Sequence, residues 1–225
     1  MPDVPTQFPE PLEDQAPAGQ VADSTTEPSS TTTRKRPKPG ERRIQILQAL
    51  ASMLEQPGGE RITTAALAAR LDVSEAALYR HFASKAQMFE ALLDFIEESC
   101  FGLIKQARES EPQPALQVFR IVHMILQFAE KNPGMSRVMV GDALVLEHER
   151  LQQRMNVFFD KVELQLKDAL FYSAEAAGSA TPSVDAQVRA GLLSAYCIGQ
   201  IQRFVRTGFK RKPTENAQQA IGLVL

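Results

Sequence analysis

Two short helix patterns joined by a tight turn, within residues 62–85, constrain the fold more than any other feature of this sequence. The first pattern covers residues 65–71 and the second covers residues 75–81. Each follows a residue type that caps helix starts, namely Thr63 or Thr64 for the first and Ser74 for the second. The apolar side chains that can pack across the turn are Leu67, Leu71, Val73 and Leu78. This pattern predicts a helix-turn-helix, whose second helix can enter the major groove of DNA.

The second of these helices carries the side chains that would face the bases. A major groove about 12 Å wide admits a helix only when the side chains that face it are small. Ala76 and Ala77 meet that condition, and hydrogen-bond donors on either side of them can reach phosphates. A basic arm, residues 34–43 with six Lys and Arg, can reach the backbone or an adjacent minor groove. The candidate DNA-binding residues are Arg34, Lys35, Arg36, Arg43, Thr63, Thr64, Ser74, Ala76, Ala77, Tyr79, Arg80, His81 and Lys85.

The formal net charge of −2 conceals an uneven distribution of charge along the chain. Residues 1–33 contain six acids and no Lys or Arg, whereas residues 34–86 contain ten basic and five acidic residues. The first segment is rich in Pro, Thr and Ser and has too little apolar surface to bury, so we expect a disordered tail. We therefore predict three parts: tail and basic arm over 1–39, DNA-binding domain over 40–86, and a helical dimerisation and partner-binding domain over 87–225.

Apolar residues three and four positions apart recur from residue 41 onward, which is the spacing of amphipathic helices. A long helix is expected after Ser84, with Gln87 placed to complete a capping box. Further helices are expected at 115–131, 135–146, 148–172 and 184–207, with a loop at 173–183 and a short helix after Pro213. Because no alternating strand pattern of useful length occurs, the predicted fold class is all-α.

Composition narrows the class of protein further. Hydrophobic residues make up 44% of the chain, which is enough to build a core. No run approaches the roughly 18 apolar residues of a membrane helix, and the first residues lack the pattern of a secretory signal. We therefore expect a cytoplasmic protein without a membrane segment. Cys100 and Cys197 are the only cysteines, and we expect both to be buried thiols in a reducing compartment.

Residue sets that mark an enzyme do not occur at usable spacing. There is no Ser/His/Asp set, no pair of catalytic carboxylates and no Gly-rich phosphate loop. His123 and His148 have no partner at metal-ligand spacing, so the sequence predicts neither a metal site nor a cofactor. We expect a binding protein rather than an enzyme.

The segment from Leu78 to Lys85 reads Leu-Tyr-Arg-His-Phe-Ala-Ser-Lys, with the capped helix upstream at the appropriate distance. This stretch resembles the DNA-binding domain of the TetR family over residues 41–90. The resemblance implies a TetR-like all-helical fold, with a three-helix headpiece followed by a helical dimerisation bundle. It also implies that Tyr79, His81 and Lys85 contact phosphates, while Phe82 belongs to the core.

Further blocks, within the headpiece and after it, resemble the nucleoid occlusion factors within that family. These blocks spread across residues 42–215 and include Lys131-Asn-Pro-Gly-Met135, Leu146-Glu-His-Glu-Arg150 and Arg203-Phe-Val-Arg206. The resemblance implies a nucleoid-associated dimer that recognises pseudo-palindromic chromosomal DNA and inhibits polymers of the tubulin-like protein FtsZ. Such inhibition keeps the division septum off unsegregated chromosome. By the same resemblance, the FtsZ-binding residues are Phe95, Met124, Lys131 and Asn132.

Small side chains recur three to five residues apart in the helix expected at 184–207, where they would let two backbones approach closely. Proteins that read DNA through a helix-turn-helix commonly pair to span two half-sites. We therefore predict a homodimer interface at Gly191, Ser194, Ala195, Gly199 and Phe204, with Phe209 beside it. The alternative is that these residues pack against other helices of the same chain.

A TetR-type repressor that a small apolar ligand releases from DNA is the alternative function. It requires an apolar cavity with a few polar anchors in the bundle, and His123, Gln127 and Tyr172 could supply the anchors. In the occlusion-factor hypothesis, DNA instead orders the headpiece relative to the long helix that starts at Lys85 and exposes or multiplies the FtsZ-binding face. A ligand that weakens DNA binding would favour the repressor, and DNA that strengthens FtsZ binding would favour the occlusion factor.

Overall fold

The computed structural model describes residues 40–56 and 62–225 of the chain. Within these residues the secondary structure consists of nine α-helices and one short 3-10 helix, without a β-strand. The predicted all-α class is therefore confirmed. The predictions made for residues 1–39, including a disordered tail and DNA contacts by Arg34, Lys35 and Arg36, lie outside the described residues.

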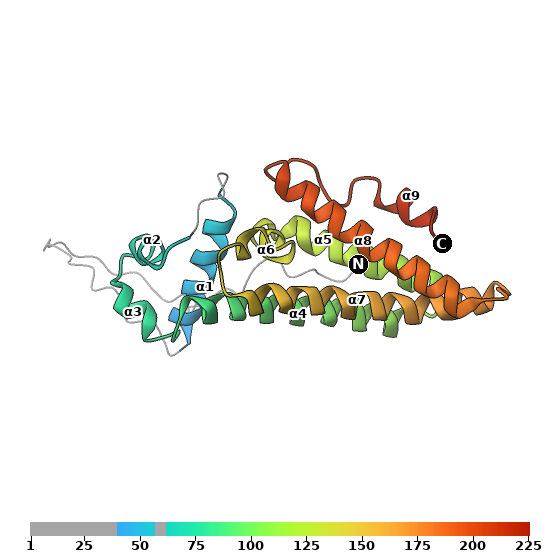
Figure 1. Cartoon of the computed structure of the whole chain (residues 1–225), viewed down its shortest axis with the longest axis horizontal. Coiled ribbons are helices and arrows are strands. Elements are labelled where there is room, and N and C mark those ends of the chain that lie inside the picture. Colours follow the sequence, from blue (N-terminus) through green and yellow to red (C-terminus); the bar gives the residue numbers. More distant parts are fainter. Residues whose placement is uncertain (1–39, 57–61) are drawn as a thin grey trace, which may run out of the picture.

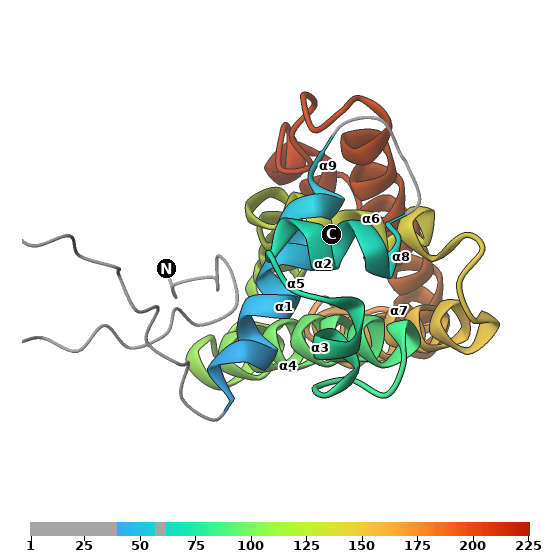
Figure 2. The same cartoon turned by 90° about the vertical axis from the view of Figure 1, so that its left-hand side faces the viewer.

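The helix-turn-helix belongs to a headpiece at one end of the elongated molecule (Figure 1). The headpiece helices are α1 (Glu41–Leu54), α2 (Thr64–Arg70) and α3 (Glu75–Tyr79). Seen from that end, they lie in front of the long helices (Figure 2). Leu67 and Leu78 are each 1% exposed, so α2 and α3 share the core that the turn predicted.

The caps of the two short helices are defined by the structure. The sequence left open whether Thr63 or Thr64 caps the first of them. Thr63 caps α2, because its hydroxyl accepts a hydrogen bond of 3.1 Å from the amide of Ala66. Ser74 caps α3 in the same way. Asp72 takes a left-handed φ of 54° in the turn between the helices, a conformation that Asp tolerates better than most residues. These local features produce the predicted helix-turn-helix.

The remaining chain forms a bundle of long helices, in which α4 packs against α5 and α7 packs along α8 (Figure 1). Its elements are α4 (Lys85–Ser110), α5 (Pro114–Lys131), α6 (Pro133–Met139), η1 (Asp142–Leu144), α7 (Glu149–Ala176), α8 (Pro182–Arg206) and α9 (Ala217–Gly222). The predicted division between residues 86 and 87 falls in the first turn of α4. One helix thus continues from the headpiece into the bundle.

The expected bounds of four helices were wrong. The helix expected at 135–146 is interrupted, because Gly141 takes a left-handed φ of 78° between α6 and η1. The loop expected at 173–183 is shorter: α7 continues to Ala176, and Pro182 begins α8 at a position where proline suits a helix start. The helix expected at 75–81 ends at Tyr79.

One apolar core extends from the headpiece through the bundle. Cys100 and Cys197 lie in this core and are 1% and 0% exposed, so the expectation of two buried thiols is confirmed. Burial raises the pKa of both thiols, and that of Cys197 reaches about 12. Neither thiol is a ready nucleophile, since the thiolate is the reactive form.

Helix α6 joins the headpiece to the bundle. Arg137 of α6 is largely buried, and its Nη1 donates a hydrogen bond of 3.2 Å to the carbonyl of Leu54, the last residue of α1. Its Nε donates to the carboxylate of Asp142 at 2.6 Å. The last carbonyls of a helix have no partner within the helix, so Arg137 satisfies one that would otherwise be buried. The orientation of α1 is therefore tied to α6.

Candidate nucleic-acid interface

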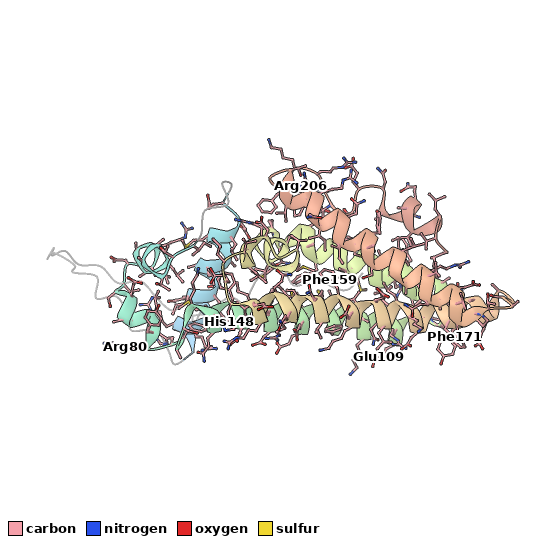
Figure 3. The ribbon with its side chains drawn as sticks, in the orientation of Figure 1. Arg80, Glu109, His148, Phe159, Phe171 and Arg206 are labelled. Carbon is pink, nitrogen blue, oxygen red and sulfur yellow. The ribbon has the colours of Figure 1, made fainter. Side chains whose placement is uncertain are left out.

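Helix α3 has the small, exposed surface that a major groove can accept. Ala76 is exposed and Ala77 is half-buried. Tyr79 is 45% exposed, and the Arg80 and His81 side chains that follow it are exposed as well. Figure 3 labels Arg80 at the headpiece end of the molecule. The structure thus brings these five predicted DNA-binding residues together on one exposed element and the turn after it.

Arg43 of α1 holds the end of this element. Its Nη1 donates a hydrogen bond of 2.7 Å to the carbonyl of His81. Its guanidinium carbon lies 4.0 Å from the centre of the Phe82 ring, which is buried as the resemblance implied. A guanidinium over an aromatic face is an attractive arrangement. In this conformation Arg43 therefore fixes the turn after α3 against α1, in addition to lying at the exposed surface.

Two other predicted phosphate donors are held by carboxylates. The hydroxyl of Thr64 donates to Glu75, with 2.5 Å between the oxygens. The ammonium of Lys85 forms an ion pair with Glu147, and the two side chains are only 18% and 8% exposed. Lys85 also lies 5.5 Å from the centre of the Phe89 ring. Sequence reasoning missed both carboxylates, because nothing in the local pattern links Lys85 to a residue 62 positions later.

The start of α4 carries the Ser84 half of the predicted capping box, while the return bond from Gln87 goes to the residue before the cap. The hydroxyl of Ser84 accepts a hydrogen bond of 3.2 Å from the amide of Gln87. The side chain of Gln87 accepts in return from the amide of Ala83, at 2.8 Å. Lys85 is therefore the first residue of a well-capped helix, next to the exposed end of the headpiece.

The four residues assigned to FtsZ binding do not form one exposed surface. Met124 is 6% exposed and Asn132 is 4% exposed, and the Asn132 amide nitrogen donates to the carbonyl of Phe128 at 2.8 Å. Both side chains are therefore largely buried in this conformation. Phe95 is half-buried, with its ring centre 6.0 Å from that of Phe128, and Lys131 is half-buried too.

A groove of about 360 Å³ lies on the outward face of α5, next to these positions. It is lined by Glu111, Leu116, Phe119, Arg120, His123, Met124 and Gln127. The imidazole of His123 stacks on the Phe119 ring, with 5.7 Å between centres. Within residues 40–56 and 62–225, Nδ1 of His123 is the one buried side-chain nitrogen or oxygen without a hydrogen-bond partner. Tyr172 is 57% exposed and does not line this groove, so it does not join His123 and Gln127 as an anchor there.

The residues predicted for the dimer interface divide between two faces of α8. Ser194 and Phe204 are buried, at 4% and 3% exposure, and the Phe204 ring packs on Phe209 at 5.2 Å. These side chains belong to the interior of one chain because they face the other helices of the bundle. Ala195 is exposed, and a Cβ built on Gly199 would meet no atom within 4 Å. Gly191 lies on the same outer side, where its nearest neighbour is the Glu163 carboxylate, 3.8 Å from a Cβ built there.

No group of three His, Cys, Asp or Glu side chains that could hold a metal occurs in the described part of the chain. Across the same residues, no helix has both the length and the apolar character that a membrane span requires.

Comparison with known proteins relates both parts of this structure to one group. Residues 46–92 match the family of bacterial regulatory proteins of the tetR type, and residues 113–225 match the SlmA-like form of the tetracyclin repressor-like C-terminal domain. The nucleoid occlusion factor SlmA of Alteromonas mediterranea is 50% identical over 174 residues, which is 77% of this chain and 89% of that protein. The chain belongs to the SlmA family. SlmA of Aliivibrio fischeri is 48% identical over 181 residues, 80% of this chain and 92% of its own length.

Solved structures share the fold at much lower identity. The transcriptional regulator FadR from Bacillus subtilis, in complex with stearoyl-CoA, superposes with a TM-score of 0.63 at 13% identity, over 80% of this chain and 96% of FadR. The ketosteroid regulator KstR2 of Mycobacterium tuberculosis has the same TM-score at 20% identity, over 83% of this chain and 94% of KstR2. The predicted TetR-like architecture is therefore confirmed, and the names of these relatives describe regulators.

Proposed function

We propose that this SlmA-family chain binds chromosomal DNA as a homodimer and, when bound, inhibits assembly of FtsZ into the division ring. The observation that carries the proposal is the 48–50% identity to nucleoid occlusion factors over 77–80% of the chain. That identity goes with matches to both the DNA-binding headpiece and the SlmA-like bundle. The protein then acts at the nucleoid and delays septum formation where chromosome remains.

The headpiece supports DNA binding through α3. Ala76 leaves room for the groove, and the exposed side chains of Tyr79, Arg80 and His81 are suited to phosphates. Because few of these side chains can read base edges, sequence-dependent DNA shape contributes to site choice. Phosphate contacts dominate the affinity, so binding weakens steeply as salt rises.

Exposed apolar side chains on α7 and α8 support the homodimer. On α7 they are Val157, Leu164 and Tyr172, and on α8 they are Val184, Val188 and Leu192, all between 48% and 60% exposed. The α8 residues recur every four positions and share a helix face with Ala195 and Gly199. The side chain of Gln187 in α8 donates a hydrogen bond of 3.2 Å to Glu163 in α7. Leu164 and Val188 are the next residues along the two helices, so the hydrogen bond links the two helices at the level of these exposed apolar residues. An apolar stripe of this extent on a surface is typical of an interface, and a twofold dimer presents two α3 helices to a pseudo-palindromic site.

The outward face of α5 supports an FtsZ contact. Phe95 and Lys131 stay on the proposed surface because both are partly exposed. Met124 contributes only as a lining residue of the α5 groove, and Asn132, which is buried, does not contribute. We extend the surface along the α5 groove to Leu116, which is 44% exposed, and to Phe119. A groove with apolar walls and a few polar groups fits a short peptide segment of a partner.

Polymer assembly tests the proposal. Light scattering of FtsZ with GTP would be followed with the full chain, with and without a duplex cloned from chromatin-bound fragments, at one salt concentration. We expect the duplex to strengthen inhibition, and we expect Arg80→Ala to lose only this DNA-dependent part. Tight binding of the duplex with unchanged FtsZ polymers would contradict the proposal.

The groove also favours one second function, a regulator released by a small ligand. The observation is the unpartnered Nδ1 of His123, beside the Phe119 ring in a space of about 360 Å³. A ligand with an apolar body and one hydrogen-bond donor would satisfy that nitrogen. This function requires a ligand that weakens DNA binding severalfold in the parent chain and has no effect on His123→Phe.

A further inference from the structure

The ion pair between Lys85 and Glu147 joins two elements that are distant in the sequence. Lys85 is the first residue of α4, directly after the cap, and Glu147 precedes the start of α7. Only 18% of the Lys85 side chain and 8% of the Glu147 side chain are exposed. A pair that is covered to this degree is screened by salt much less than one on the open surface. The contact therefore has a larger effect on where the Lys85 ammonium points than a surface pair would have.

Ion pairs follow the seam where α4 and α7 pack together, and α4 supplies the cation at both ends of it. At the far end this cation is Arg108, which lies 3.6 Å from Asp168 of α7. In the middle of the seam α4 supplies the acids: Glu90 pairs with Arg150 at 2.7 Å, and Asp94 and Glu97 pair with Arg154 at 2.6 and 2.7 Å. At the headpiece end α4 supplies the cation, and the acid comes from the segment before α7. Within the part of the chain that the structure describes, Lys85 is the one α4 lysine of the seam that lies next to the exposed end of the headpiece. Glu147 thus places a negative charge beside it.

A phosphate that approaches Lys85 meets this carboxylate. The phosphate must either displace Glu147 from the ammonium or share the ammonium with it, and the two anions repel each other in a partly covered site. Lys85 is a predicted phosphate contact, so the same amine has two anionic partners that exclude one another.

We propose that Glu147 competes with DNA phosphate for Lys85 and thereby lowers the DNA affinity of the unbound protein. This inference rests on the proposed function for the role of DNA, and it adds Glu147 as a residue that sets DNA affinity. When Lys85 turns to a phosphate, the segment before α7 loses one of its contacts with α4. Val145 and Leu146 in that segment are 66% and 75% exposed, and Leu146 has a left-handed φ of 68°, so little apolar packing holds the segment in place.

The test compares DNA affinities of full-length variants. Glu147→Gln keeps the shape of the side chain and removes its charge, so we expect DNA to bind roughly three- to tenfold more tightly. Glu149→Gln is the matched control, because this exposed acid lies two residues away and contacts Gln153 rather than Lys85. We expect the control to stay within about twofold of the parent chain, since a rim charge changes binding little.

A double variant separates competition from a general loss of negative charge. In a Lys85→Ala background, Glu147→Gln should have no further effect on DNA affinity. An equal gain in both backgrounds, or an unchanged or weaker affinity of Glu147→Gln alone, would overturn the inference. Circular dichroism of each variant checks that the fold is intact. Because FtsZ takes no part in this measurement, failure of FtsZ inhibition and failure of the competition are seen in separate experiments.

Discussion

Gly134, near the start of α6, lies directly against the carbonyl of Ala51 in α1. A Cβ built on Gly134 would come within 2.5 Å of that oxygen and 3.2 Å of the Leu54 Cβ. Both neighbours belong to the headpiece, so a side chain at this position cannot be accommodated by moving a flexible tip. The absence of a side chain at Gly134 therefore sets how closely the headpiece approaches the bundle.

Substitution of Gly134 should shift α1 and weaken DNA binding. We expect Gly134→Ala to lower the free energy of unfolding by about 1–3 kcal/mol, the usual cost of overpacking. We also expect a severalfold loss of DNA affinity, because α1 carries Arg43 and supports α3. Urea unfolding and DNA titration measure the two effects.

Gly102 provides the matched control for this substitution. A Cβ on Gly102 in the middle of α4 would meet no atom within 4 Å. We expect Gly102→Ala to stabilise the protein by about 0.5–1 kcal/mol, because alanine is the better helix former. An equal loss of stability in both variants would show that the close approach of Gly134 has no special role.

Arg137 should be more important for stability than Asp142, its ion-pair partner. Arg137→Ala leaves the Leu54 carbonyl without the hydrogen bond from Nη1, and an unsatisfied buried group costs about 1–3 kcal/mol. Asp142 is 46% exposed, so Asp142→Ala should cost about 1 kcal/mol or less. Urea unfolding of both variants checks the order, and a larger loss in Asp142→Ala would contradict it.

A charge in the apolar stripe of α8 should separate the proposed dimer. We expect Leu192→Asp to weaken self-association roughly tenfold or more, as loss of a central interface residue does. Sedimentation equilibrium measures this as a shift toward the 24.9 kDa monomer. Leu223→Asp is the control, because Leu223 is 89% exposed, lies beyond α9 and is not one of the α7 and α8 residues of the stripe. Dissociation by Leu223→Asp, or none by Leu192→Asp, would place the interface elsewhere.

Acid should release the segment before α9 from α5. Burial alone would raise the pKa of Glu130, but hydrogen bonds from Thr214 and Lys212 and the charge of Lys212 outweigh it and lower the pKa. A carboxyl whose folded-state pKa is lowered adds stability above its unfolded value of about 4.3 and loses it as pH falls through the folded value. The stability difference between the parent chain and Glu130→Gln should therefore shrink on acidification.

Urea unfolding of the two proteins from about pH 7 down to about pH 3 measures this difference across the expected window. Glu109→Gln is the control, since the Glu109 side chain is 67% exposed and lies 3.9 Å from Lys105. A difference that stays constant across that range would mean that ionised Glu130 does not anchor the segment.

Local sequence chemistry was sufficient to predict the helix-turn-helix. Ser74 and Ser84 cap helices because their hydroxyls bond amides three residues later, an interaction that depends on nearby residues alone. The burial of Cys100 was predicted on a different basis, the general tendency of free cysteines to be buried. Helix bounds were less predictable where one glycine mattered, since Gly141 breaks a continuous apolar pattern through its backbone conformation.

Contacts between distant segments were not predictable from local patterns. Glu147 reaches Lys85 because α7 starts beside the beginning of α4, a property of the whole bundle. The resemblance placed Met124 and Asn132 on a binding surface, but the packing of α5 against neighbouring helices buries both. A resemblance transfers positions along a helix, while the exposed face depends on the neighbours of that helix.

In the proposed function, binding of DNA and binding of FtsZ to this chain are coupled. The most direct measurement is the FtsZ affinity of the full chain with and without a saturating duplex, together with the DNA affinity with and without FtsZ, at one salt concentration. Linkage requires both ratios to be the same, and we expect each to be roughly 5- to 100-fold in favour of the ternary complex. Phe95→Ala should abolish FtsZ binding and leave the DNA affinity of the free protein unchanged. A ratio of one in both directions, with DNA bound tightly, would contradict the account.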